Sequence, residues 1–255
     1  LNHRGIASGS MGVDTADINT DGIDDLLITD YADQFPMFFF SDGFIGYTDN
    51  IMRTGVGRPV LPHVNWGLGF ADFDLDRDRD VYICNGHFLR NVRDIDPRTQ
   101  FRVPNVLLVN NGAGRYRADA VSQPVDAMPE SSRGAVFDDL DNDGDVDIAI
   151  LNFAASAQVL RCQAPAERHW IELQLVGTHA NRDGVGARVT IQTQSHEQSA
   201  EVHAGRGYQS HFGSRLHFGL GDAVNATNLR VAWPSGKTQT LTDVPSNQIL
   251  TIVEQ

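Results

Sequence analysis

The chain contains 255 residues with a mass of 28.0 kDa, and 41% of them are hydrophobic. It therefore has room for one large domain or two ordinary ones with real cores, and it is not disordered throughout. Its net charge of −13, from 33 acidic and 20 basic residues, argues against nucleic acid or an anionic membrane as the main partner. No run approaches the ~20 apolar residues of a membrane-spanning helix. Residues 1–10 lack the apolar centre of a secretory signal, so we expect any such signal to have been removed or to lie outside this chain.

The negative charge is concentrated in the first part of the chain. Residues up to Cys162 include 25 acidic and 13 basic residues, whereas those from Gln163 to Gln255 include 8 and 7. This asymmetry predicts two domains with different roles, at residues 1–163 and 164–255.

The acidic part contains an internal repeat. Residues 17–28 (DINTDGIDDLLI), 72–83 (DFDLDRDRDVYI) and 139–150 (DLDNDGDVDIAI) align without gaps. Each has aspartate at positions 1, 5 and 9 and aspartate or asparagine at position 3, and each ends in an apolar triplet. An EF-hand would need glutamate at position 12, which is isoleucine in all three segments, so we expect these loops to lead into strands and not helices.

Clustered carboxylates need a physical reason, because two like charges ~4 Å apart repel by roughly 4 kcal/mol at an effective dielectric near 20. Such a site opens, takes up protons or binds a cation. Oxygen ligands at positions 1, 3, 5 and 9 with a backbone carbonyl at 7 suit Ca²⁺, while Mg²⁺ demands a stricter octahedron. A single loop of this kind would be read as a solvated turn, but three copies favour calcium. The candidate calcium ligands are Asp17, Asn19, Asp21, Ile23, Asp25, Asp72, Asp74, Asp76, Asp78, Asp80, Asp139, Asp141, Asp143, Asp145 and Asp147.

The middle loop departs from the other two at position 6. Gly22 and Gly144 occupy this position in the outer loops, where a positive φ is wanted, and Arg77 replaces them in the middle. Either Arg77 and Arg79 partly neutralise the aspartates without metal, or the loop binds metal in a distorted form. We therefore rank it below the other two as a calcium site.

Two hairpins follow the first two loops. Residues 38–43 (FFFSDG) and 107–112 (LLVNNG) each read as a strand entering a turn. Units of a metal loop, a strand and a hairpin resemble the FG-GAP/VCBS repeats of β-propellers, and the resemblance implies one calcium loop in each blade. It predicts about three blades. Because closed propellers have 4–8 blades, either a longer parent chain or other copies of this chain would complete the ring.

From Trp170 onward, apolar and polar residues alternate, as in residues 171–175 (IELQL) and 229–233 (LRVAW). This pattern predicts half-buried strands in a small antiparallel β-sandwich or barrel. The fold class expected is therefore all-β, with a partial propeller followed by this second domain.

Several short sequence motifs carry a second resemblance. They are residues 168–170 (RHW), 181–189 (NRDGVGARV), 205–210 (GRGYQS), 216–221 (LHFGLG), 231–236 (VAWPSG) and 247–248 (NQ). Together they resemble the ASPIC/UnbV domain, found after FG-GAP/VCBS repeats in bacterial secreted proteins and in the cartilage acidic protein family. The resemblance implies a propeller followed by this domain, calcium, and an extracytoplasmic setting.

An insertion from Gly86 to Arg102 is locally basic, with four arginines against Asp94 and Asp96. We favour a solvated excursion paired with its own domain. The alternative is a recognition loop that includes His87.

The sequence contains no recognisable catalytic motif of these kinds: it has no GxSxG, HExxH or phosphate-binding loop. A zinc site at His203, His211 and His217 matches no established spacing. We expect Trp233 to be a core residue and not a surface on which a sugar ring stacks. Trp66 and Phe70 are expected to pack between blades.

The function expected is a calcium-binding extracellular recognition or adhesion module without evident catalysis, with a protein or glycan ligand. It would lie outside the cell, on its surface or in the periplasm. The first alternative is a self-assembling structural subunit of a surface or extracellular assembly. The second is an accessory enzyme with an unrecognised site.

Overall fold

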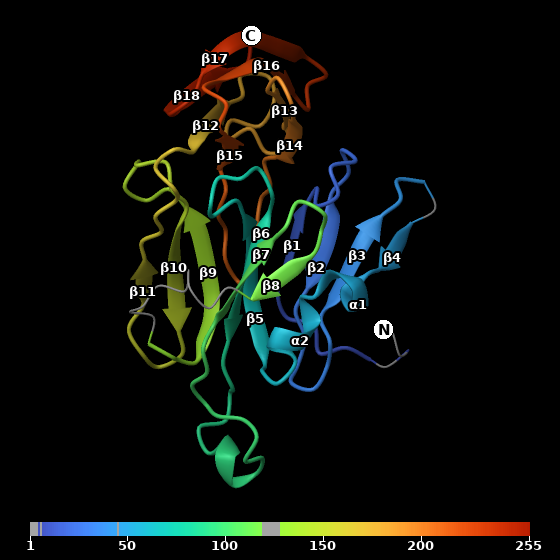
Figure 1. Cartoon of the computed structure of the whole chain (residues 1–255), viewed down its shortest axis with the longest axis vertical. Helices are drawn as coiled ribbons and strands as arrows, with labels where there is room; N and C mark the ends of the chain where they lie inside the picture. The colour runs from blue at the N-terminus through green and yellow to red at the C-terminus, as the bar shows by residue number, and fades with distance from the viewer. Residues whose placement is uncertain (1–4, 6, 45, 119–127) are drawn as a thin grey trace.

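The computed structural model describes residues 5, 7–44, 46–118 and 128–255, and these residues form an all-β fold (Figure 1). Among them, no helix is long and apolar enough to cross a membrane. The elements are β1 (Val13–Ala16), β2 (Asp25–Ile28), β3 (Met37–Ser41), β4 (Tyr47–Asp49), α1 (Ile51–Thr54), α2 (Gly57–Val60), β5 (Asn65–Ala71), β6 (Asp80–Asn85), η1 (Val92–Asp94), β7 (Val106–Asn110), β8 (Tyr116–Ala118), β9 (Ser132–Asp138), β10 (Asp147–Asn152), β11 (Gln158–Leu160), β12 (His169–Val176), β13 (Arg188–Gln192), β14 (Glu197–Glu201), β15 (Arg215–Gly221), β16 (Asn225–Ala232), β17 (Thr238–Pro245) and β18 (Gln248–Val253).

The first three sheets are antiparallel meanders with the orders β1-β2-β3-β4, β5-β6-β7-β8 and β11-β10-β9. Their inner strands β1, β5 and β9 lie next to one another, so the sheets spread like a fan (Figure 1). Each acidic loop joins an inner strand to the second strand of its sheet, which confirms that the loops lead into strands. Both predicted hairpins are present, as β3–β4 and β7–β8.

Hydrophobic clusters hold the three sheets together. Leu27, Phe38 and Leu68 lie in the cluster between the first two sheets, where Phe70 also packs. Phe137 and Ile148 belong to the next cluster, against which Trp66 packs. The prediction that Trp66 and Phe70 pack between blades is therefore confirmed.

The last two sheets have the orders β15-β12-β18 and β14-β13-β16-β17. Their inward residues, such as Ile171, Val189 and Trp233, form one shared cluster. Trp233 is 3% exposed, which confirms its place in the core. The antiparallel prediction is wrong for one pair, because β18 lies parallel to β12.

The expected count of about three blades is also corrected, because the described residues form five blade-sized sheets. The last two do not stand apart as a separate sandwich. Gly207 forms a β-bridge with Val13 of β1, and Phe212 enters the same cluster as Phe137 of β9. The segment between β14 and β15 thus runs along the inner strands, and the boundary at residues 163 and 164 stays a prediction.

Candidate metal centre

The three acidic loops share one backbone hydrogen-bonding pattern. The aspartate at position 1 accepts the N–H groups of positions 5 and 6 on its two oxygens. In the second loop, Asp72 accepts them from Asp76 at 3.0 Å and from Arg77 at 2.8 Å. The same pair of bonds occurs at Asp17 and Asp139. The repeat found in the sequence is therefore a repeat of geometry.

Two positions of every loop have left-handed backbone. Position 6 has a positive φ at Gly22, Arg77 and Gly144, as its glycines predicted. Position 4 does too, at Thr20, Leu75 and Asn142, and sequence reasoning missed it. Only asparagine among those three residues favours this conformation, so the residue types carried a weak signal.

The aspartate at position 9 has a structural role that the sequence did not indicate. In the second loop, Asp80 Oδ2 accepts the Phe73 N–H at 3.2 Å and Oδ1 accepts the Asn110 N–H at 2.8 Å. Asp25 and Asp147 make the equivalent bonds in their sheets. This carboxylate therefore ties the start of its loop to the third strand, and only its remaining lone pairs are free for a cation.

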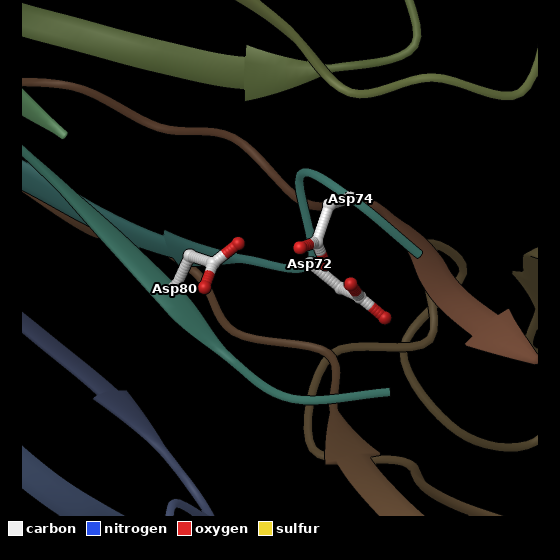
Figure 2. A group of neighbouring side chains, drawn as sticks. All are labelled: Asp72, Asp74 and Asp80. Atoms are coloured by element: carbon white, nitrogen blue, oxygen red, sulfur yellow. The ribbon is translucent and has the colours of Figure 1, made fainter. Parts of the chain in front are cut away.

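The second loop brings three carboxylates together. One oxygen each of Asp72, Asp74 and Asp80 lies within 4.8 Å of the others, and Figure 2 shows Asp80 beside the loop that carries the other two. Asp72 and Asp80 are each 1% exposed. Burial raises the pKa of Asp72 to about 8 and of Asp80 to about 9, against the opposing effects of the Arg79 charge on Asp72 and of the Asn110 N–H on Asp80. Ionising this cluster is thus costly unless a cation compensates.

The arginines of this loop point elsewhere. Arg77 donates to Ser195 Oγ at 3.4 Å, and Arg79 donates to the His217 carbonyl at 3.2 Å. Within the described part of the chain, neither guanidinium lies within ion-pair distance of the loop's aspartates, although both lower nearby pKa values through space. Partial neutralisation by these arginines, the first of the two alternatives expected for this loop, thus acts through space, and the second, a distorted metal site, stays a prediction. Burial and the neighbouring Asp76 raise the pKa of Asp78 to about 6.

The third loop brings together Asp139, Asp141 and Asp143, whose oxygens also lie within 4.8 Å of one another. Asp139 is buried and the other two are exposed. Arg161 lies 2.8 Å from Asp141 and 2.7 Å from Asp143, so it supplies some of the counter-charge itself. Asp145 turns away to accept the Ala164 N–H.

The first loop has an amide at position 3. Asn19 donates to Asp21 at 3.0 Å, and the Ile23 N–H binds the other oxygen of Asp21. Burial raises the pKa of Asp17, and it raises that of Asp25 to about 6. Three of its odd-numbered loop positions are aspartate, where the other two loops have five, so this loop offers fewer carboxylate ligands.

The donor set fits a hard cation. All the groups that converge are carboxylate oxygens, and Ca²⁺ takes such ligands at 2.3–2.6 Å in flexible geometry. Oxygens within 4.8 Å of one another are close enough to share one ion at those distances. The second and third loops are therefore acidic clusters that could hold a metal ion.

The three histidines considered for zinc have separate partners. His203 Nε2 lies 3.4 Å from Asp24 Oδ2, and His211 Nδ1 accepts the Gly205 N–H. His217 Nε2 donates to the Gly144 carbonyl at 2.8 Å, and burial lowers its pKa to about 4. The structure does not bring them together.

The surroundings of His203 also lack the geometry of a hydroxyl–histidine–carboxylate triad. Thr15 Oγ1, at 3.3 Å, and Asp24 both face the same nitrogen, Nε2, whereas a triad uses the two ring nitrogens for different partners. The cavity beside them encloses about 60 Å³, which is far below the ~300–1,000 Å³ of ligand pockets.

The basic insertion carries η1 and projects from the sheets (Figure 1). Arg98 pairs with Asp33 at 3.0 Å and with Asp96 at 2.7 Å, while Arg102 pairs with Glu130 at 2.8 Å. His87 is 5% exposed. These contacts agree with an excursion that is salt-bridged to its own chain.

Comparisons with known proteins agree with both resemblances. Residues 177–255 match the family model described as ASPIC and UnbV. The chain is 25% identical to cartilage acidic protein 1 of Xenopus tropicalis over 94% of this chain and 36% of the relative. It is 27% identical to cartilage acidic protein 1 of Mus musculus over 72% of this chain and 28% of the relative. The chain thus spans about a third of the length of these curated relatives. Residues 177–255 are therefore similar to the ASPIC and UnbV family, and they follow sheets that fit FG-GAP repeats, in a chain similar to cartilage acidic protein 1.

Proposed function

We propose that this chain is a calcium-binding extracellular recognition or adhesion module. The observation that carries the proposal is the convergence of Asp72, Asp74 and Asp80 in a buried position. A divalent cation would supply the positive charge that these carboxylates otherwise obtain only from protons. The third loop would hold a second ion in the same way, and the first loop, with its amide ligand, would hold the weakest.

Calcium suits this role better than magnesium. The position 9 aspartates already accept two backbone N–H groups, so they can offer only the remaining lone pairs, at angles that the backbone fixes. A flexible coordination sphere tolerates such ligands, whereas Mg²⁺ requires near-ideal octahedral geometry. At about 2 mM calcium and dissociation constants of 10⁻⁴–10⁻³ M, each site would stabilise the fold by about 0.7–1.8 kcal/mol.

Titration calorimetry on chelator-treated protein tests the proposal. Calcium should bind with a dissociation constant near 10⁻⁴–10⁻³ M, and magnesium should bind more weakly. Asp74→Asn should remove or weaken one site. Asp183→Asn, in an exposed turn outside the loops, is the matched control and should titrate like the wild type. Absence of calcium binding, or equal binding by both variants, would contradict the proposal.

An extracellular, cell-surface or periplasmic location and a protein or glycan ligand belong to the same proposal. Support comes from the similar protein's name, since cartilage is an extracellular tissue. No catalytic step is part of it. A reproducible activity lost in His87→Ala or His211→Ala, with folding intact, would overturn that part.

A second candidate function is that of a self-assembling structural subunit. Leu151 is 63% exposed and Val159 is 66% exposed, and the pairing of β10 with β11 places both on one face with Ala149. An exposed apolar sheet face favours association. Sedimentation analysis separates the cases, because a strict monomer at high concentration excludes assembly, whereas dissociation by Leu151→Glu would support it.

A further inference from the structure

Each of the three acidic loops contacts the C-terminal part of the chain, residues 169–253. In the first loop, Arg188 of β13 donates to the Gly22 carbonyl at 2.7 Å and pairs with Asp24 at 3.3 Å. Arg188 is largely shielded, with 29% of its side chain exposed. The carbonyl it binds is that of position 6, next to the position 7 carbonyl expected to face an ion.

The second loop packs directly on β15. The Gly221 N–H donates to the Leu75 carbonyl at 3.1 Å. A methyl group on Gly219 would lie 2.1 Å from Asp72 Oδ2, so the β15 backbone sits against a candidate ligand. Arg79 donates from the loop to the His217 carbonyl.

The third loop is held by side chains of β12 and β15. Arg215 donates to Asp138 Oδ1 at 3.0 Å and to Asn142 Oδ1 at 2.9 Å. The ring of His217 donates to the Gly144 carbonyl. A side chain at Gly144 would clash with the Trp170 ring, which lies 1.9 Å from where a Cβ would stand. His217 therefore links the second and third loops at once.

These contacts depend on the shape of the loops. They use backbone carbonyls at positions 4 and 6 and the side chains around them, and these groups are placed by the left-handed residues of each loop. The nine-residue loops together contain fourteen aspartates and two arginines. In the absence of a cation, mutual repulsion would spread the loops wherever their carboxylates are ionised, and spreading would move every carbonyl that the C-terminal part binds.

We propose that cation binding in the three loops controls how firmly residues 203–214 are seated on the inner strands. This segment joins β14 to β15, so contacts between the loops and the C-terminal sheets support both of its ends. Arg206 forms a bidentate pair with the buried Asp14 at 2.7 and 2.8 Å, and Phe212 packs edge-on against Phe137. Loss of the loop contacts on β13 and β15 would weaken the support at both ends of this segment and leave its own contacts through Arg206, Gly207 and Phe212. The inference rests on the proposed function, because it assigns a regulatory consequence to the same sites.

Hydrogen–deuterium exchange on the full chain tests the inference. Amides of residues 203–214 should exchange at least about tenfold faster in chelator than in 2 mM calcium, because local opening becomes cheaper. Amides of β16, inside the C-terminal cluster, should change little. Arg215→Gln should give fast exchange in this segment even with calcium, while Arg230→Gln, exposed on β16, is the matched control.

The outcomes separate the two claims. Calcium binding by calorimetry with unchanged exchange in residues 203–214 would overturn the seating inference and leave the proposed function standing. Absence of calcium binding would overturn both. Calcium-dependent protection of this segment that is lost in Arg215→Gln would support both.

Discussion

Gly219 of β15 lies directly against the carboxylate of Asp72. A methyl group at Gly219 would come within 2.1 Å of Asp72 Oδ2 and 2.8 Å of the Leu75 Cα. We expect Gly219→Ala to destabilise the fold by about 1–3 kcal/mol, the usual cost of overpacking. Denaturant unfolding measures this. The same substitution should cost less in an Asp72→Ala background, and an equal cost in both backgrounds would show that the two residues do not interact.

Arg77 occupies a left-handed position with a φ of 85°, where the other two loops have glycine. An L-residue pays about 1–2 kcal/mol for this conformation. Arg77→Gly should therefore be more stable than Arg77→Ala by about 1 kcal/mol, since both variants lose the same side-chain contacts. Thermal unfolding of the two variants in chelator gives the comparison. A less stable glycine variant would mean that the loop carries no strain at this residue.

The buried aspartates predict an unusual pH dependence for the metal-free protein. Burial raises the pKa of Asp72 to about 8 and of Asp80 to about 9, from 3.8. The folded state therefore binds more protons than the unfolded state between these values, and stability should fall progressively as pH rises from about 4 to about 9. Calcium should flatten this decline, because it favours the ionised form. Urea midpoints at pH 6.5 and pH 9, with chelator and with calcium, check the prediction, and a decline of the same size in both would contradict it.

Glu254 affects the pH dependence of stability in the opposite direction from the buried loop aspartates. Although burial would raise its pKa, hydrogen bonds from the Ala180, His179 and Thr178 N–H groups and from Ser235 lower it to about 2. The stability that this carboxylate supplies is present above pH 4.5 and is lost as the pH falls toward 2. Glu254→Gln should thus unfold more easily at pH 7, and the difference from the wild type should shrink at pH 3. The exposed Glu167 offers the control, as Glu167→Gln should match the wild type at both values.

The sequence predicted the repeated parts of the molecule well. Spacing of aspartates located all three loops, and the apolar triplets after them became β2, β6 and β10. Alternation from Trp170 onward predicted the strands of the last two sheets because it reflects one buried and one exposed face.

The missed features depend on contacts between distant residues. Pairing of β18 with β12 joins Gln248 to Ile171, and nothing local to either segment signals a parallel neighbour. Asp80 both lies in the acidic cluster and accepts the Asn110 N–H, and the second role depends on a residue 30 positions away in the sequence. The inner strands β1 and β9 were also missed, because each precedes an acidic loop whose pattern is the stronger signal in the sequence.

A crystal structure grown in millimolar calcium is the most direct test of calcium binding by the loops. Anomalous scattering data should show a peak between Asp72, Asp74 and Asp80, and a second between Asp139, Asp141 and Asp143. Ordered loops that keep these side chains in place with no peak between them would contradict it.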